Sequence, residues 1–200
     1  MNPTPLKKAR TYGPDVILRD GPFGPVVEKT YRARTWPIRL IGRLLVARES
    51  YIYEKLEGVA GIPPLCAAPD SCTLVTGYMG GANLRETAVK PDAAYFRRLE
   101  TLIDAMHDRG VIHLDLRNRR NYGIDPQGHP YLVDFATALY LPKQGPLFKF
   151  LCLIDRSGSL KVKGKLAPEL LDAGERRHRD RGRWLSRLWL PSRLKSLLRR

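Results

Sequence analysis

The segment that decides the fold runs from His107 to Phe135 and has the sequence HDRGVIHLDLRNRRNYGIDPQGHPYLVDF. It contains two short apolar runs, and Asp115 follows the first while Asp134 ends the second. Asn121 lies between them, six residues after Asp115 and thirteen before Asp134. On neighbouring loop ends, one carboxylate could orient a hydroxyl while the amide oxygen and the other carboxylate hold Mg²⁺. Magnesium commonly takes one or two carboxylates together with phosphate oxygens.

Two helices are predicted before this segment. Apolar residues at three- and four-residue steps indicate a helix from about Pro91 to Gly110 and an earlier one from Pro37 to about Gly58. The earlier stripe, which we expect to face the core, consists of Ile41, Leu44, Leu45, Ile52 and Leu56. Glu49 falls on this stripe. A buried carboxylate needs a cationic or hydrogen-bonding partner, although Glu49 could instead lean into water at the stripe's edge.

The remaining elements predict an α+β fold. Short β-branched runs at 16–18 and 26–31, separated by Gly-Pro and Asp-Gly turns, are typical of antiparallel strands, and 72–76 predicts another. Later helices are expected around 147–155 and 168–176, followed by a basic amphipathic helix. Strands therefore concentrate in the first part of the chain and helices in the second.

Composition excludes several classes of protein. With 43% hydrophobic and 28% charged residues, neither wholesale disorder nor a membrane-spanning bundle fits. Three cysteines without metal-ligand spacing favour a reducing compartment over a disulfide framework or a structural zinc site. The first residues lack the pattern of a secretory signal, so we expect a cytoplasmic protein.

Those segments together resemble the protein-kinase-like superfamily. Residues 107–117 are similar to its helix end and catalytic loop, and 121–135 to its metal-binding Asn, hairpin and DFG strand. Residues 74–84 resemble its fifth strand and hinge, Glu49 its helix-C glutamate, and Val26–Lys29 its lysine-bearing strand. The resemblance covers roughly residues 10–140 and implies a compact kinase-like α+β fold. Its expected parts are a small antiparallel-sheet N-lobe (1–79), a reduced helical C-lobe (80–176) and a basic tail (177–200).

The resemblance also implies a role for each site residue, with ATP and Mg²⁺ as cofactors. Lys29 would contact the nucleotide phosphates and be fixed by Glu49, and Asp115 would orient the attacking hydroxyl. Arg117, in place of the usual lysine, would neutralise the transferring phosphoryl group. The expected magnesium ligands are Asn121 and Asp134. The expected adenine and ribose contacts are Thr76, Gly77, Met79 and Asn83.

Several positions depart from the kinase pattern. No GxGxxG precedes Lys29, Leu114 replaces the arginine of many regulated protein kinases, and Ala136 replaces the last DFG residue. The catalytic loop is one residue longer than usual, which puts Arg120 at the expected Asn position. We prefer Asn121 as the ligand because an arginine cannot bind a cation.

Only 66 residues follow Asp134, too few for the full helical lobe of protein-substrate kinases. This size and the arginine-rich lead into the first helix are most similar to bacterial lipopolysaccharide-core sugar kinases, the 3-deoxy-D-manno-octulosonic acid and heptose kinases, and to RIO-type kinases. The resemblance implies transfer of the ATP γ-phosphoryl group to a hydroxyl of a lipopolysaccharide-core sugar. The alternatives are a compact RIO-like serine/threonine protein kinase and a non-catalytic, nucleotide-binding pseudokinase.

The net charge of +15 is concentrated at one end of the chain. Ten basic and two acidic residues lie between Glu175 and Arg200, and Trp184 and Trp189 are interleaved with them. Such a segment favours an anionic membrane surface, which would place the protein at the inner face of the inner membrane. Packing of its apolar side on the kinase lobe is the alternative. We do not expect nucleic acid as a partner, because no aromatic platform or RNA motif is present.

Overall fold

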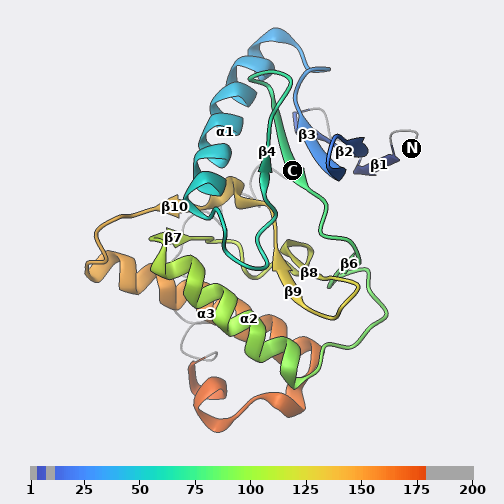
Figure 1. Ribbon diagram of the computed structural model, residues 1–200. Coiled ribbons are helices and arrows are strands. Elements are labelled where there is room, and N and C mark those ends of the chain that lie inside the picture. Colours follow the sequence, from blue (N-terminus) through green and yellow to red (C-terminus); the bar gives the residue numbers. More distant parts are fainter. Residues whose placement is uncertain (1–3, 8–11, 179–200) are drawn as a thin grey trace.

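The computed structural model describes residues 4–7 and 12–178, and an antiparallel five-stranded sheet forms its first part (Figure 1). The strand order is β1-β2-β3-β5-β4. The strands are β1 (Thr4–Lys7), β2 (Asp15–Gly21), β3 (Gly24–Thr30), β4 (Leu65–Cys66) and β5 (Thr73–Gly77). The strands predicted at 16–18, 26–31 and 72–76 are confirmed, whereas β1 and β4 were not predicted.

Strand β3 lies at the centre of this sheet and carries Lys29. In the β2–β3 hairpin Lys29 pairs with Val16, and across the β3–β5 ladder it pairs with Leu74. Next along the strand, the hydroxyl groups of Thr30 and Thr73 share a buried hydrogen bond of 2.8 Å. Pairing on both sides fixes the register of β3, and thus the face of the sheet from which Lys29 projects.

Helix α1 (Trp36–Lys55) buries a different face from the one predicted. Ile52 and Leu56 are buried as expected, but Ile41, Leu44 and Leu45 are exposed. The inward face is instead formed by Gly42, Val46, Glu49, Ile52 and Tyr53. Gly42 permits this orientation because a Cβ there would lie 2.5 Å from Cγ of Tyr31. The closest contact of α1 is therefore made at Gly42, which has no side chain. The spacing of apolar residues cannot reveal such a contact.

Two long helices cross the second part of the chain (Figure 1). Helix α2 (Ala93–Asp108) begins at Asp92, whose carboxylate accepts a 2.7 Å bond from the Tyr95 amide, and it buries its predicted apolar face. Helix α3 (Pro146–Leu166) is a single helix, so the prediction that it ends near residue 155 is wrong. Gly158 lies inside α3 where a Cβ would be 2.9 Å from the Leu116 carbonyl carbon. Its role is therefore close helix–loop packing.

Short elements connect these helices to the sheet. A three-stranded sheet has the order β6-β8-β9, and β10 pairs with β7. A 3₁₀ turn at Pro168–Leu170 and a helical segment at 173–178 follow α3, where one helix was predicted over 168–176. The bounds are β6 (Ala82–Asn83), β7 (Val111–Ile112), β8 (Tyr122–Ile124), β9 (Pro130–Leu132) and β10 (Leu139–Tyr140), with 3₁₀ turns η1 (Arg119–Asn121) and η2 (Phe135–Thr137). The predicted C-terminal amphipathic helix lies outside the described residues.

A continuous hydrophobic core joins the two parts. It includes Leu56 of α1, Leu74 of β5, Leu99 and Met106 of α2, and Phe135 of η2. The ring of Phe135 packs edge-on against Tyr53 at 5.1 Å between centroids. The segment after Asp134 is thereby held against α1, and the expected α+β architecture is observed.

Candidate active site

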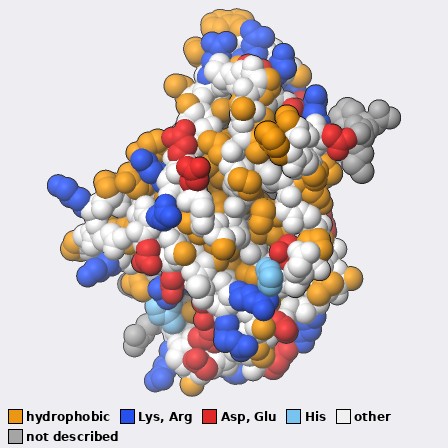
Figure 2. All heavy atoms as spheres, in the orientation of Figure 1, with side chains coloured by type: hydrophobic (Ala, Val, Ile, Leu, Met, Phe, Trp, Pro, Cys, Tyr) orange, Lys and Arg blue, Asp and Glu red, His pale blue; other side chains and the backbone are white. Residues whose placement is uncertain are grey.

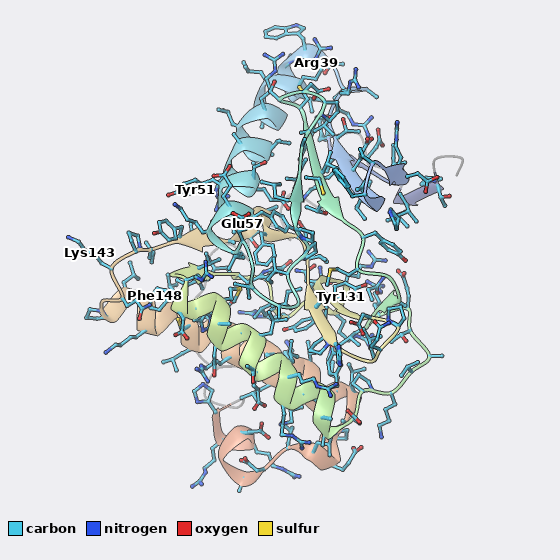
Figure 3. The ribbon with its side chains drawn as sticks, viewed as in Figure 1. Arg39, Tyr51, Glu57, Tyr131, Lys143 and Phe148 are labelled. Atoms are coloured by element: carbon cyan, nitrogen blue, oxygen red, sulfur yellow. The ribbon has the colours of Figure 1, made fainter. Side chains whose placement is uncertain are left out.

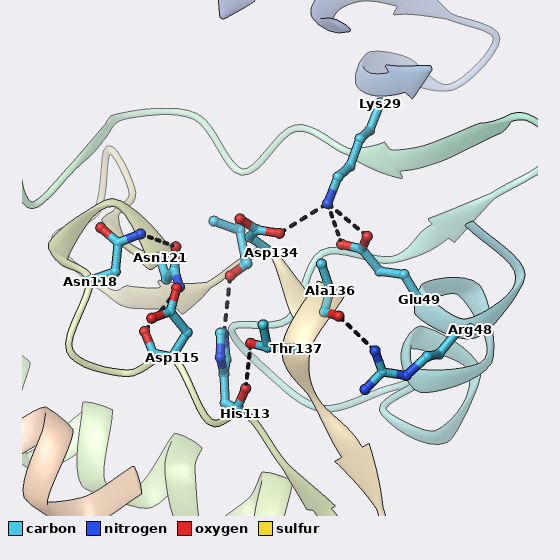
Figure 4. A network of polar contacts seen from close by, with 11 residues as sticks. Lys29, Arg48, Glu49, His113, Asp115, Asn118, Asn121, Asp134, Ala136 and Thr137 are labelled. Carbon is cyan, nitrogen blue, oxygen red and sulfur yellow. Dashed lines mark hydrogen bonds and ion pairs between the residues drawn. The ribbon is translucent and has the colours of Figure 1, made fainter. Parts of the chain in front are cut away.

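Three charged side chains from distant parts of the chain meet between the sheet and the helical part (Figure 4). Lys29 Nζ lies 3.0 and 2.7 Å from the two carboxylate oxygens of Glu49 and 2.9 Å from Oδ1 of Asp134. The Glu49 side chain is only 4% exposed, whereas that of Asp134 is 49% exposed. The sequence-based pairing of Lys29 with Glu49 is therefore present, and Asp134 completes the group.

Burial and charge act in opposite directions on this group. Burial alone would lower the pKa of the Lys29 ammonium, but the negative charges of Glu49 and Asp134 raise it above its ordinary value. Burial raises the pKa of the Glu49 carboxyl, and the attraction of Lys29 offsets part of that rise. Lys29 is therefore a fixed cation at neutral pH, with one buried and one accessible carboxylate beside it.

A second polar group surrounds Asp115 in the loop after β7. The Asn121 side-chain amide donates to the Asp115 carbonyl at 3.0 Å and to its carboxylate at 3.3 Å, and Oδ1 of Asn121 accepts from Asn118 at 3.2 Å. Asn121 is buried and Arg120 is exposed, so Asn121 is the one of the two that lies beside Asp115. The extra loop residue is accommodated by the 3₁₀ turn that starts after Asn118.

The hairpin β8–β9 brings the two groups together. The Val133 amide donates to the Asn121 carbonyl at 3.0 Å, so Asp134 directly follows the residue paired with Asn121. Asp134 itself has a left-handed backbone, with φ of 65°. This conformation is costly for a residue with a side chain and is concentrated at functional sites in proteins. It turns the Asp134 carboxylate away from its strand and toward Lys29 (Figure 4).

Asp155 of α3 was not identified from the sequence, although its carboxylate anchors the loop that follows β7. It is 1% exposed and accepts hydrogen bonds from the backbone amides of His113 at 2.7 Å and Leu114 at 2.8 Å. His107 Nε2 lies 3.2 Å from the same carboxylate. Leu114 has φ of 64°, and its bond to Asp155 stabilises that strained backbone immediately before Asp115. The sequence did contain a signal for Asp155. Like Glu49, it is a carboxylate that falls on the apolar stripe of a predicted helix.

Arg48 was also missed. Its guanidinium donates to the carbonyl of Ala136 at 3.0 Å and to that of Ala138 at 2.6 Å. On the other side of this segment His113 Nε2 lies 3.1 Å from the Val133 carbonyl, and the His113 ring packs against Phe135. Arg48 and Glu49 are adjacent in α1, so one helical turn fixes both Lys29 and the backbone after Asp134.

The expected nucleotide-base contacts are only partly arranged for that role. Thr76 is buried in β5, and Met79 follows the strand. The Gly77 amide donates to the Pro64 carbonyl at 2.9 Å. The Asn83 side chain donates to Glu86 at 2.7 Å and accepts from the Arg85 amide at 3.1 Å. A contact of the Gly77 amide or of the Asn83 side chain with adenine or ribose would therefore require these bonds to change.

The donor set near Asp134 fits magnesium bound with a nucleotide. No group of three or more His, Cys, Asp or Glu side chains that could hold a metal is found in residues 4–7 and 12–178. Mg²⁺ does not require such a cage, because it is commonly held by one or two carboxylates together with substrate phosphates. Asp134 supplies an accessible carboxylate and Asn121 an amide oxygen, while Lys29 supplies positive charge for phosphates. Arg117, two residues after Asp115, is half-buried.

A cavity of about 410 Å³ lies elsewhere, between α2, α3 and the segment at 172–178. Five of its charged side chains pair with one another, because Lys163 contacts Glu100 and Glu175 while Arg156 contacts Asp104. None of the predicted site residues lines this cavity. We therefore place the candidate site at Lys29, Asp115 and Asp134.

The antiparallel sheet with its lysine–glutamate pair, joined to a helical part with an Asp-Asn-Asp loop and hairpin, is a protein-kinase-like fold. Among solved structures the chain is similar to Rio2 kinase from Chaetomium thermophilum in its ADP/Mg²⁺–phosphoaspartate complex, with a TM-score of 0.64. The match has 17% sequence identity and covers 88% of this chain but only 60% of that one. No protein-family model matches the chain, and no curated protein matches it in sequence. At this identity the likeness shows the fold alone.

Proposed function

We propose that the protein is an ATP-dependent phosphotransferase that moves the γ-phosphoryl group to a hydroxyl. The observation that carries this proposal is the contact of Lys29 with both Glu49 and Asp134. Asp115 lies in the loop after β7, and Asn121 immediately precedes the hairpin that leads to Asp134. The five polar residues that phosphoryl transfer would use are therefore all present in the chain, and the contacts join them into two neighbouring groups. Phosphoryl transfer depends mainly on positioning and on neutralising charge, which is the chemistry that this group can supply.

Each residue then has a distinct part in the reaction. Lys29 binds the α- and β-phosphates of ATP, and Glu49 holds the Lys29 ammonium in place. Asp134 and Asn121 hold Mg²⁺, which supplies neutralisation of the phosphate oxygens when it is bound. Asp115 accepts a hydrogen bond from the attacking hydroxyl and orients it, and Arg117 offsets negative charge on the transferred group.

The acceptor that we propose is a hydroxyl of a lipid-linked sugar of the lipopolysaccharide-core type, reached from the cytoplasmic face of the inner membrane. The small helical part supports this choice, as does the basic C-terminal tail, which suits an anionic membrane surface. In residues 4–7 and 12–178, no helix has both the length and the apolar composition for a membrane crossing. The membrane association that we propose for the tail is peripheral.

A RIO-like protein kinase is the second candidate, and the likeness to Rio2 kinase favours it. That structure is described as an ADP/Mg²⁺–phosphoaspartate complex, so an aspartyl phosphate on the protein itself is a further acceptor to consider. Sugar, serine or threonine, and aspartate acceptors give chemically different products. A phosphate ester resists hydroxylamine, whereas an acyl phosphate is cleaved by it.

Incubation with γ-labelled ATP and Mg²⁺ tests both candidates. Separate reactions would contain lipid-linked core oligosaccharide, a mixed protein extract, or the protein alone. The proposal predicts label in the oligosaccharide and its loss in Asp115→Asn. Hydroxylamine-stable label in proteins of the extract would favour the RIO-like serine/threonine kinase, and hydroxylamine-labile label on the protein alone would favour an aspartate acceptor. The absence of transfer to every acceptor by a folded, ATP-binding protein would favour a pseudokinase.

A further inference from the structure

The outward face of α1 carries large apolar side chains that are exposed in the described part of the chain (residues 4–7 and 12–178). Trp36 is 72% exposed and Leu44 is 69% exposed, and Leu40 and Ile41 are each more than half exposed. These residues lie at three-, four- and five-residue spacings, so they share one broad side of the helix. Single exposed apolar residues are common on proteins, but a continuous group along one helix marks an interaction surface.

Arginine side chains accompany this face, and acidic residues do not. From Tyr31 to Arg48 the chain contains five arginines and no Asp or Glu. Arg32 pairs with Asp70, and Arg34 pairs with Asp15 at the start of β2. By contrast, the side chains of Arg39 and Arg43 make no hydrogen bond or ion pair in the described part of the chain. Figure 3 places Arg39 at the end of the molecule where α1 begins, and Figure 2 shows hydrophobic and basic side chains gathered there.

Charge distinguishes between the occupants that this surface could take. A second copy packed α1 against α1 would bring two sets of unpaired arginines together, which disfavours that contact. The C-terminal tail, with ten basic and two acidic residues from Glu175 onward, has the same sign of charge. An anionic bilayer complements both features, because Trp and Leu enter the headgroup region while Arg remains among lipid phosphates.

We propose that the N-terminal half of α1 docks on an anionic membrane surface, with Trp36, Leu40 and Leu44 inserted and Arg39 and Arg43 at the phosphates. This contact is separate from the tail and does not depend on the proposed catalytic activity. Since α1 also carries Glu49, the membrane would contact the helix that holds Lys29 in place. The docked protein would then carry its nucleotide site on the same membrane surface that holds a lipid-bound acceptor.

The test follows Trp36 in the full-length chain. Trp184→Phe and Trp189→Phe leave Trp36 as the only tryptophan of the three. Vesicles of phosphatidylglycerol and phosphatidylethanolamine, with acyl chains brominated to quench nearby indoles, should quench Trp36 and shift its emission to shorter wavelength. Phosphatidylcholine vesicles with the same bromination should have little effect. Arg39→Ala with Arg43→Ala should lower partitioning roughly 30-fold at low salt.

Matched variants separate this face from other routes to the membrane. Leu40→Glu with Leu44→Glu should abolish the quenching of Trp36, whereas Leu147→Glu, at a residue of α3 that is 62% exposed, should retain it. Thermal melting verifies that each variant is folded. Binding to vesicles without quenching of Trp36 would overturn the proposal and assign binding to another segment. No binding at all would also overturn it, and so would a lipid-independent, concentration-dependent shift accompanied by dimers in sedimentation.

Discussion

Replacing Glu49 with Gln tests whether the Lys29–Glu49 contact is a buried ion pair that organises the site. Gln has nearly the same shape as Glu but carries no charge, so the variant removes the counter-ion with little change in packing. The Glu49 side chain is 4% exposed and that of Lys29 is 18% exposed, and both carboxylate oxygens lie within 3.0 Å of Nζ. The variant therefore leaves the Lys29 ammonium partly desolvated with only Asp134 to balance it.

Loss of one partner from a buried pair costs about 3–5 kcal/mol. Asp134 remains 2.9 Å from Lys29, which places Glu49→Gln at the lower end of that range. We expect the free energy of unfolding to fall by about 3 kcal/mol. For a chain of this length, that corresponds to a melting temperature lower by about 6–12 °C.

Urea denaturation, monitored by circular dichroism, measures the decrease in the free energy of unfolding. Asp104→Asn is the matched control, because Asp104 pairs with Arg156 at 2.8 Å but both side chains are about half exposed. Asp104→Asn should lower the free energy of unfolding by less than about 1 kcal/mol. Lys29→Met alone and combined with Glu49→Gln completes a double-mutant cycle, in which a direct contact appears as non-additivity.

A loss below about 1 kcal/mol for Glu49→Gln would refute this reasoning, because the pair would then behave like one exposed to solvent. Strict additivity in the cycle would refute it as well.

Lys29 also sets a pH dependence of the free energy of unfolding. Since its pKa is raised in the folded protein, its stabilising contribution is complete below about pH 10.5 and declines as the pH rises above that value.

Three further predictions concern the segments around the site. Asp155→Ala removes the hydrogen-bond acceptor of the His113 and Leu114 amides. The free energy of unfolding, measured by urea denaturation, should fall by about 3 kcal/mol, and a decrease below about 1 kcal/mol would contradict the anchoring role of Asp155. Arg48→Met should accelerate hydrogen exchange at 135–140 while leaving α2 unchanged; equal rates would contradict the contacts to Ala136 and Ala138. Burial raises the pKa of the Cys152 thiol from 9.0 to about 11, so at pH 9 its thiolate fraction should be about 50-fold smaller in the folded chain than in urea. Iodoacetamide labelling with mass spectrometry measures this difference, and equal rates in both states would contradict it.

The sequence predicts most of the site because its signals are local. Asp115, Asn121 and Asp134 lie within one short segment, and Glu49 is conspicuous as a carboxylate in an apolar stretch. Asp155 gives the same kind of signal, but its partners are backbone amides 41 and 42 residues away, which no side-chain pattern identifies. Backbone partners of this kind are specified only by the packed fold.

The face of α1 was predicted incorrectly for a physical reason. Counting apolar residues assumes that each one is buried, and Ile41, Leu44 and Leu45 therefore seemed to form the core stripe. Burial is instead determined by the close contact of Gly42 with Tyr31 and by the ion pair of Glu49 with Lys29. The same error reveals a surface, since Ile41 and Leu44, which remain exposed, belong to the apolar face of α1 that we assign to membrane docking.

Binding of Mg²⁺ and ATP is the most direct test of the central claim, because it requires no knowledge of the acceptor. At about 100 times its dissociation constant, a ligand adds roughly 2.7 kcal/mol to the folded state. We predict a rise in melting temperature of about 5–11 °C with ATP and Mg²⁺, a smaller rise without Mg²⁺, and loss of the magnesium effect in Asp134→Asn. A folded protein with no shift, or a shift that Asp134→Asn leaves unchanged, would contradict the account.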